Sequence, residues 1–243
     1  MKGAVMVSWE DVPHLSAEQK ATILAGIPAW QRDARTKGLP QLGAGAIYQI
    51  PESEVVTAPF EIPRHWPRCF GFDVGWNRTA AIWLAKNPDT GSVYAYDEYY
   101  RGQAEPSVHA AAIRSRGVWI PGAVDPAARG RSQIDGSKLL DLYLDLGLDI
   151  EKADNTRETG IYSVWELLSQ GQLKFFATLT NTRSEYRLYR RDERGNIVKS
   201  HDHLMDALRY AVMSGLARAK TEPAARPDGK SWFYWAPQAV WSG

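Results

Sequence analysis

Three closely spaced β-rich runs constrain the fold of this chain more than any other feature. They are CFGFDVGW (residues 69–76), TAAIWLAKN (79–87) and VYAYDEYYR (93–101). Only two residues separate the first run from the second, and the second gap contains PDTG, a composition typical of hairpin turns. We therefore expect three antiparallel strands in a meander that begins near Arg68.

Helical and strand-like segments alternate after this meander. Helical patterns occur at 107–116, 133–146, 159–169 and 201–219, and strand-like runs at 119–125, 148–150 and 173–176. Residues 183–199, rich in arginine, are interpreted as a basic hairpin. Three antiparallel strands followed by alternating helices and strands predict an α/β fold with a mixed sheet flanked by helices.

The two ends of the chain differ from this middle part. Residues 1–67 lack the pattern of a self-sufficient domain. Within them, a capping box at Ser16 predicts one helix, a second short helix is expected after Pro28, and the Pro-punctuated stretch 58–68 is interpreted as a surface-wrapping linker. Residues 221–243 begin as a Pro-rich linker and end in SWFYWAPQAVWSG, which we interpret as a flexible, aromatic-rich tail.

Composition excludes several classes of protein. The formal net charge is +1, so affinity for nucleic acid would have to come from local clusters of Lys and Arg. Cys69 is the only cysteine, which rules out an intramolecular disulfide or a thiolate zinc cluster and predicts a buried thiol. No apolar stretch approaches the ~20 residues that span a bilayer. We expect a protein of a reducing cytoplasm, with no membrane partner.

The first acidic motif lies on the first strand. In Phe70-Gly-Phe-Asp73-Val-Gly-Trp76, an aspartate stands between apolar neighbours with a glycine two residues to either side. Burying a carboxylate is costly unless a counter-charge or a metal accompanies it, and glycines let a ligand approach the backbone. Asp73 is therefore a candidate metal ligand. The alternative is an aspartate that only accepts backbone hydrogen bonds at the end of a strand.

Two further acidic motifs follow. Asp125 ends the strand after the first helix, where α/β proteins gather their ligands, although Asp-Pro is also an ordinary turn. At the start of the last helix, Asp202 and Asp206 are four residues apart, about 40° around the helix axis, and His203 can face the same side. The alternative is that Asp202 caps the helix and Asp206 is solvated.

Carboxylates on two strands and a helix are the ligands that a two-metal phosphodiesterase requires. Hard oxygen ligands select Mg²⁺ or Mn²⁺. Two such ions can bridge a scissile phosphate, one activating water and the other stabilising the leaving oxygen. The sequence thus predicts a binding site for two ions, with Asp73 in the bridging position.

Taken in order, these motifs resemble the large subunit of tailed-bacteriophage terminases. The resemblance rests on FDVGW, VDPAARG, YRLYRRDERGNIVK and HDHLMDALRY, and covers about residues 68–218. Its last two elements are the most specific. WEDVPHL, near the N-terminus, is similar to the segment that leads from the ATPase domain of that family to its nuclease domain.

The resemblance implies a ribonuclease H-like nuclease domain at 68–220, preceded by a stub of the ATPase domain and a linker at 1–67. It implies that Asp73, Asp125 and Asp206 bind metal, with His203 beside Asp206. Asp202 ranks lower, because that position is often not acidic in the family. The glutamate that ribonucleases H proper carry on their first helix is missing, as in terminases, which argues against cleavage of RNA–DNA hybrids.

The activity implied is a metal-dependent endodeoxyribonuclease that cuts concatemeric viral DNA during genome packaging. The implied partners are double-stranded DNA, the ATPase domain of the same full-length protein, the portal and the small terminase subunit, in the host cytoplasm. The chain itself has no ATPase motif, because Ala224 stands where the first glycine of a phosphate-binding loop would precede Gly229.

A cluster of basic residues is the predicted DNA-binding surface. Its members are Arg183, Arg187, Arg190, Arg191, Arg194 and Lys199. Such side chains bind backbone phosphates without reading bases. The alternative is a solvated hairpin whose charge is partly cancelled by its own acidic residues.

Other functions remain open. A Holliday-junction resolvase or a transposase-like nuclease of the same fold would use similar acids, and a catalytically inactive module could dock on DNA without cutting it. An actin-like ATPase or sugar kinase is excluded by size, because that fold needs a second domain and a glycine-rich adenosine site.

Overall fold

The computed structural model describes residues 8–9, 15–27, 32, 36, 45–125 and 136–224. A seven-stranded mixed sheet forms its centre, in the order β1-β7-β4-β3-β2-β5-β6. The strands are β1 (Val56–Thr57), β2 (Arg68–Asp73), β3 (Thr79–Lys86), β4 (Val93–Arg101), β5 (Gly122–Val124), β6 (Ile150–Lys152) and β7 (Leu173–Phe176). The helices are α1 (Ala17–Ala25), α3 (Glu52–Val55), α4 (Pro106–Arg114), α5 (Gly136–Asp145), α6 (Arg157–Ser169), α7 (Thr180–Leu188), α8 (His203–Tyr210), the π-helical η2 (Ala211–Gly215) and α9 (Leu216–Arg218).

The predicted meander is confirmed. β2 pairs antiparallel with β3, and β3 pairs antiparallel with β4. β5 continues the sheet parallel to β2 and is followed by β6, while β7 joins β4 in parallel on the other side. The α/β class with a mixed sheet flanked by helices is therefore as expected.

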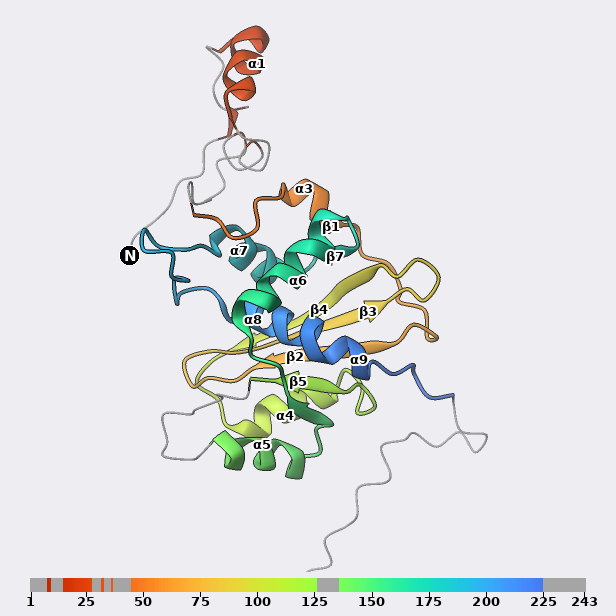
Figure 1. Cartoon of the computed structure of the whole chain (residues 1–243). Coiled ribbons are helices and arrows are strands. Elements are labelled where there is room, and N and C mark those ends of the chain that lie inside the picture. The colour runs from red at the N-terminus through yellow and green to blue at the C-terminus, as the bar shows by residue number, and fades with distance from the viewer. Residues whose placement is uncertain are drawn as a thin grey trace, which may run out of the picture.

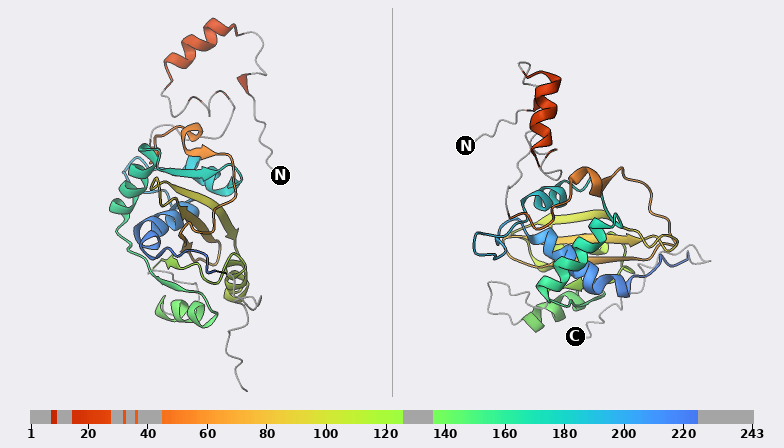
Figure 2. Two further views of the ribbon diagram at one scale, coloured as in Figure 1. Left: turned by 90° about the vertical axis from the view of Figure 1, so that its right-hand side faces the viewer. Right: turned by 45° about the horizontal axis from the view of Figure 1, so that its top comes forward.

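Helices cover both faces of the sheet (Figures 1 and 2). Alternate residues of β3 point to opposite faces, as the two-residue period of a strand requires. Ile82 and Leu84 belong to a core cluster that α6 and α8 complete, whereas Ala81 and Trp83 belong to a second cluster completed by α4 and α5. The central strand is apolar on both sides because both of its faces are covered.

Gly71 determines how closely α8 approaches the sheet. A Cβ atom at this position would lie 1.8 Å from the carbonyl oxygen of Ala207, so only glycine allows α8 to pack directly on β2. Gly71 lies two residues before Asp73, and Ala207 directly follows Asp206. The contact therefore brings Asp73 at the end of β2 close to the acids at the start of α8.

The segment before Arg68 contributes more than a linker. Its strand β1 pairs in parallel with β7 at one edge of the sheet. Tyr48, Val55 and Trp66 are buried in the larger core cluster, where the ring of Tyr48 stacks on Tyr186 of α7. The sheet and its core thus extend N-terminally beyond the expected domain start.

The predicted basic hairpin at 183–199 is wrong in its first half. Residues Thr180–Leu188 form α7, because Thr182, Glu185, Tyr186 and Tyr189 recur at three- to four-residue spacing and are all buried. Only the second half forms a hairpin, with Arg191 bridged antiparallel to Ile197. The local run of arginines concealed the helical period of the residues between them.

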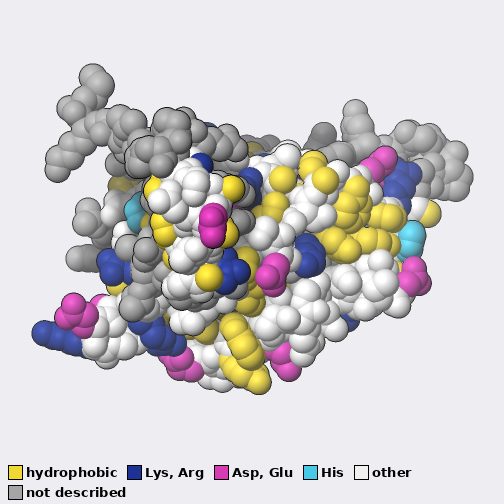
Figure 3. Space-filling model, turned by 90° about the horizontal axis from the view of Figure 1, so that it is seen from above, with side chains coloured by type: hydrophobic (Ala, Val, Ile, Leu, Met, Phe, Trp, Pro, Cys, Tyr) yellow, Lys and Arg dark blue, Asp and Glu magenta, His cyan; other side chains and the backbone are white. Residues whose placement is uncertain are grey.

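Ion pairs also neutralise much of the predicted basic cluster. Arg183 and Arg187 both bind the carboxylate of Glu52, at 2.6 Å and 2.9 Å, and Arg191 binds Glu158 at 2.6 Å. On the face shown in Figure 3, the Lys and Arg side chains lie scattered among Asp and Glu side chains. This view shows no extended basic patch among the described residues.

Several smaller expectations can be checked. Ser16 forms the predicted capping box at the start of α1, and Cys69 is buried. The expected closing helix is divided into α8, η2 and α9. Within the described segments, no helix is long and apolar enough to cross a membrane. The second short helix after Pro28 falls largely outside the described residues, and so does the predicted tail, of which only residues 221–224 are described.

Candidate active site

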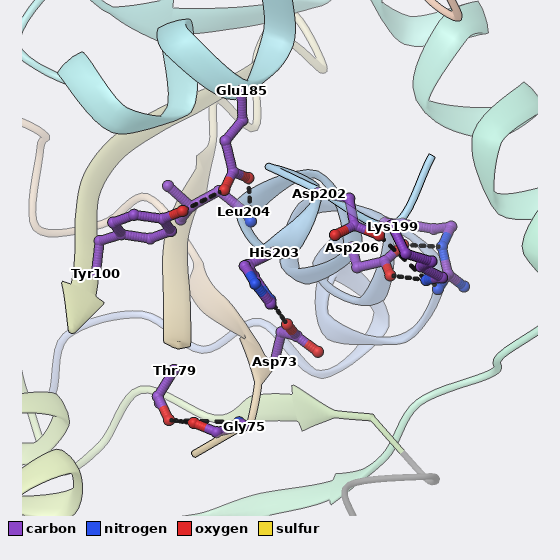
Figure 4. A network of polar contacts seen from close by, with 11 residues as sticks. Asp73, Gly75, Thr79, Tyr100, Glu185, Lys199, Asp202, His203, Leu204 and Asp206 are labelled. Atoms are coloured by element: carbon purple, nitrogen blue, oxygen red, sulfur yellow. Dashed lines mark hydrogen bonds and ion pairs between the residues drawn. The ribbon is translucent and has the colours of Figure 1, made fainter. Parts of the chain in front are cut away.

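Asp73 ends β2 directly beside the start of α8. Nδ1 of His203 donates a hydrogen bond of 2.8 Å to Oδ2 of Asp73 (Figure 4). The Asp73 side chain is only 15% exposed, so this contact is shielded from water on most sides. The histidine thus holds the carboxylate in one orientation at the edge of the sheet.

The acids of the site interact electrostatically. Burial raises the pKa of Asp73, and the hydrogen bond from His203 opposes that rise. The negative charges of Asp206 and Asp125 raise the Asp73 pKa further. The hydrogen bond to Asp73 in turn raises the pKa of His203, although burial opposes this shift. Negative charges gathered around a nearly buried acid favour a bound cation.

Asp125 lies at the same edge of the sheet. It follows β5, and its backbone N–H donates a hydrogen bond of 3.1 Å to the carbonyl oxygen of Phe72 on β2. Because β2 and β5 are parallel and Phe72 is paired with Val124, the next residues along both strands, Asp73 and Asp125, lie side by side. The side chain of Asp125 is partly exposed.

Asp202 and Asp206 share a single cation at the start of α8. Nζ of Lys199 lies 3.1 Å from Oδ2 of Asp202 and 3.3 Å from Oδ2 of Asp206 (Figure 4). The two carboxylates are 7% and 9% exposed, whereas the lysine side chain is 55% exposed. Asp202 precedes the helix as its N-cap residue but makes no side-chain capping bond. Its carboxylate binds Lys199 instead.

Arg209 fixes the other oxygen of Asp206. Its Nη2 and Nε atoms lie 3.2 Å and 3.4 Å from Oδ1 of Asp206, and its guanidinium group lies over the ring of Tyr210. Arg209 is completely buried. The helix α6 makes room for it at Gly160, where a Cβ atom would lie 2.5 Å from the arginine stem. Arg209 therefore holds Oδ1 of Asp206, while Oδ2 contacts Lys199.

Glu185 is a buried acid of the site that the sequence analysis missed. Its Oε2 accepts a hydrogen bond of 2.6 Å from the backbone N–H of Leu204, and its Oε1 accepts one of 2.7 Å from the Tyr100 hydroxyl (Figure 4). A side chain of α7 thus caps α8, in place of the N-cap residue. The signal available in the sequence was its helical spacing from buried tyrosines, which the hairpin interpretation obscured.

The turn between β2 and β3 was also missed. Trp76 is 49% exposed only three residues after Asp73. The Thr79 hydroxyl donates to the carbonyl oxygen of Gly75 at 2.9 Å, which closes the turn (Figure 4). The guanidinium group of Arg78 lies over the ring of Tyr100, 4.4 Å from its centroid. Trp76 belongs to the FDVGW motif of the sequence, but the motif does not show that its side chain is exposed.

The donor set matches the chemistry of hard divalent cations. Asp73, Asp125 and Asp206 supply carboxylate oxygens at one edge of the sheet, and oxygen donors suit Mg²⁺ and Mn²⁺. The Lys199 ammonium already bridges two carboxylates, as a bound cation would. In the described part of the chain, however, no three His, Cys, Asp or Glu side chains stand at the spacing that holds a metal ion. The acids would have to exchange protein partners for an ion.

The fold and the site together define a ribonuclease H-like nuclease domain, with acids on adjacent strands and on the helix packed across them. Residues 70–214 match the family model described as the terminase RNaseH-like domain. The chain belongs to this family.

Individual relatives agree with this assignment. The large terminase subunit of Enterobacteria phage LP7 is 34% identical over 217 residues, covering 85% of this chain and 45% of that protein. The solved nuclease domain of the P22 large terminase is 32% identical with a TM-score of 0.68, covering 74% of this chain and 96% of that one. The large terminase nuclease of thermophilic phage G20c, solved with bound magnesium, has a TM-score of 0.50 at 16% identity over 71% of this chain and 99% of that one, a likeness in fold alone. The chain spans less than half the length of the LP7 relative.

Proposed function

We propose that this chain is a metal-dependent endodeoxyribonuclease that cuts concatemeric viral DNA during genome packaging. The observation that carries the proposal is the hydrogen bond of 2.8 Å between Asp73 at the end of β2 and His203 at the start of α8. Asp125 lies beside Asp73 on the neighbouring strand, and the charge of Asp206 raises the pKa of Asp73. The family supports it, because the matching solved structure from P22 is a nuclease domain.

Mg²⁺ or Mn²⁺, two ions in the full site, would be held by Asp73, Asp125 and Asp206, with Asp202 as a further candidate. When bound, such ions activate water and stabilise the leaving oxygen of a phosphodiester. The bound magnesium of the distant G20c nuclease is consistent with this choice.

The residues of this chain have separate tasks in the proposed reaction. His203 orients the carboxylate of Asp73, and its raised pKa keeps an imidazolium beside that acid at mildly acidic pH. Arg209 holds one oxygen of Asp206 and leaves the other facing the site. Glu185 caps α8 and so fixes the position from which His203 and Asp206 extend. These contacts pre-organise the acids without touching the substrate.

DNA is the proposed substrate. Ion pairs within the protein reduce the number of basic residues that are available to bind its phosphates. Arg190 and Arg194 remain the stronger candidates for phosphate contacts. The other members of the basic cluster are in ion pairs: Arg183 and Arg187 with Glu52, Arg191 with Glu158, and Lys199 with Asp202 and Asp206. The ATPase domain, the portal and the small terminase subunit are proposed partners in the host cytoplasm. The length of the LP7 relative leaves room for such a further domain.

The test is cleavage of supercoiled plasmid by the full chain. We expect nicking and linearisation with Mg²⁺ or Mn²⁺, none in EDTA, and none by Asp73→Asn under any condition. Undiminished cleavage in EDTA would refute the metal-dependent mechanism. A four-way junction and a linear duplex are cut in parallel, and a strong preference for the junction would favour a resolvase. DNA binding without cleavage by the unmodified chain would favour a docking module.

A further inference from the structure

Two cations bind Asp206, and they differ in how firmly they are held. Arg209 is completely buried and contacts Oδ1, while the Lys199 side chain is 55% exposed and contacts Oδ2. The arginine cannot leave without exposing a buried ion pair, whereas the lysine can turn into solvent. One partner of this acid is therefore permanent and the other is exchangeable.

The backbone conformation before α8 brings Lys199 into contact with Asp202 and Asp206. Lys199 follows the short hairpin that Arg191 and Ile197 close, and it precedes α8 by only a few residues. His201, between Lys199 and the helix, has a φ of +58°, a left-handed conformation that is uncommon outside glycine. This turn folds the chain back, so that the ammonium group reaches both Asp202 and Asp206.

We propose that Lys199 is an internal counter-ion that competes with the divalent metal for Asp206 and Asp202. The inference rests on the proposed function, and it states which cation contacts the carboxylates before a metal ion binds. The ammonium group bridges Oδ2 of both carboxylates, and Arg209 holds the other oxygen of Asp206. A metal ion that binds Asp206 must therefore displace Lys199.

The displaced lysine acquires a new role. Its ammonium group remains at the mouth of the site, where a DNA phosphate would approach the bound ion. An amine that neutralised a carboxylate before metal binding can then contact a phosphate oxygen. Metal loading and DNA binding are thereby coupled through one side chain, which reconciles the ion pairs of Lys199 with its expected contact to DNA.

The experiment measures Mn²⁺ binding to the full chain by calorimetry, without DNA, and compares three substitutions of lysine. Lys199→Met keeps the apolar stem but removes the charge, and we expect it to bind Mn²⁺ at least about threefold more tightly than the unmodified chain. Lys199→Arg keeps the charge and should bind no more tightly. Lys86→Met, at the end of β3 remote from the acids along the strand, should leave the affinity unchanged.

Thermal melts provide a second readout that does not depend on activity. In EDTA, Lys199→Met should melt below the unmodified chain, because two nearly buried carboxylates lose their shared counter-ion. At saturating Mn²⁺ this difference should shrink or reverse, because the ion replaces the lost charge and binds the variant more tightly.

The outcomes separate this inference from the proposed function. If the unmodified chain binds no Mn²⁺, or if Asp73→Asn binds it equally well, the metal site itself is misassigned. If binding depends on Asp73 but Lys199→Met binds Mn²⁺ no more tightly than the unmodified chain, the competition is refuted and the nuclease proposal stands. Weaker binding by Lys199→Met would make the lysine a support of the site rather than a competitor.

Discussion

Asp73 and His203 are 130 residues apart in sequence and 2.8 Å apart in the structure, joining the first strand of the meander to the first residue of α8. Gly71 makes this contact possible, because any larger residue would push α8 away from β2. The hydrogen bond between Asp73 and His203 thus depends on the packing of α8 against the sheet.

Removing the charge of Asp73 should stabilise the protein in EDTA while it abolishes cleavage. Burial and two neighbouring acids raise the pKa of Asp73, so the charged form is disfavoured in the fold. Asp73→Asn should therefore raise the free energy of unfolding by on the order of 1 kcal/mol, and the melting temperature by about 2–4 °C. Thermal melts in EDTA and in Mn²⁺ check this. A variant that melts well below the unmodified chain in EDTA would show that the ion pair with His203 outweighs the repulsion.

The free energy of unfolding of the metal-free protein, measured in EDTA, should fall as the pH rises through the folded pKa of His203. The hydrogen bond to Asp73 raises the pKa of His203 above its ordinary value of 6.5. The folded state then binds this proton more tightly than the unfolded state, so the contribution is complete below about pH 6.5 and is lost as pH rises through the folded pKa. Urea unfolding in EDTA from pH 5.5 to 8.5 measures the loss, and His203→Gln should remove this component. An unchanged slope in that variant would assign the dependence to other groups.

Local patterns were sufficient to predict the centre of the fold. The apolar runs of β2, β3 and β4 predicted the meander, and the acid within the first run predicted Asp73 as a site residue. The i, i+4 spacing of Asp202 and Asp206 predicted that both face one side, and both bind Lys199. These features are readable because strand and helix periods act over a few residues.

The missed features depend on contacts between distant residues. Glu52 lies 131 and 135 positions before its partners Arg183 and Arg187, so no local pattern indicated that these arginines are neutralised. Glu185 was not predicted as a site residue, because its partner, the N–H of Leu204, lies beside it only when α8 packs on α7. Such side chains contact residues far away in the sequence, so local periodicity does not reveal their role.

Glu185 should matter for stability in proportion to its two buried hydrogen bonds. Glu185→Gln keeps the size but replaces the charged partner of the Leu204 N–H and the Tyr100 hydroxyl with a neutral amide, so both hydrogen bonds weaken. We expect a loss of about 1–3 kcal/mol in the free energy of unfolding, together with weaker Mn²⁺ binding, because the capped helix carries Asp206. Glu193→Gln, on an exposed residue of the hairpin, is the matched control in urea unfolding. Equal effects of the two substitutions would contradict the capping role.

The arginines should divide into structural and DNA-binding groups. Replacing Arg190 and Arg194 by Ala should weaken binding of duplex DNA and lower its salt dependence by about one unit of slope for each lost phosphate contact. Replacing Arg183 and Arg187 should mainly reduce stability, because both bind Glu52. Fluorescence titrations of labelled duplex at several salt concentrations, in EDTA, distinguish the two. A larger loss of slope in the Arg183 and Arg187 variant would place the DNA surface on α7.

Asp206 and Asp202 should respond differently to loss of charge, although they share Lys199. Asp206→Asn leaves the buried Arg209 without its anion, and Nη1 of that arginine already makes no hydrogen bond to the described residues. The free energy of unfolding should fall by about 2 kcal/mol. This is less than the ~3–5 kcal/mol lost when a buried ion pair is fully broken, because Asn still offers an oxygen to Arg209. Asp202→Asn loses only a partner that is 55% exposed and should cost about 0–1 kcal/mol. Cleavage should vanish in Asp206→Asn and persist at a reduced rate in Asp202→Asn. Equal loss of cleavage in both, with Mn²⁺ affinity falling equally, would mean that both acids bind metal and that Asp202 belongs among the ligands.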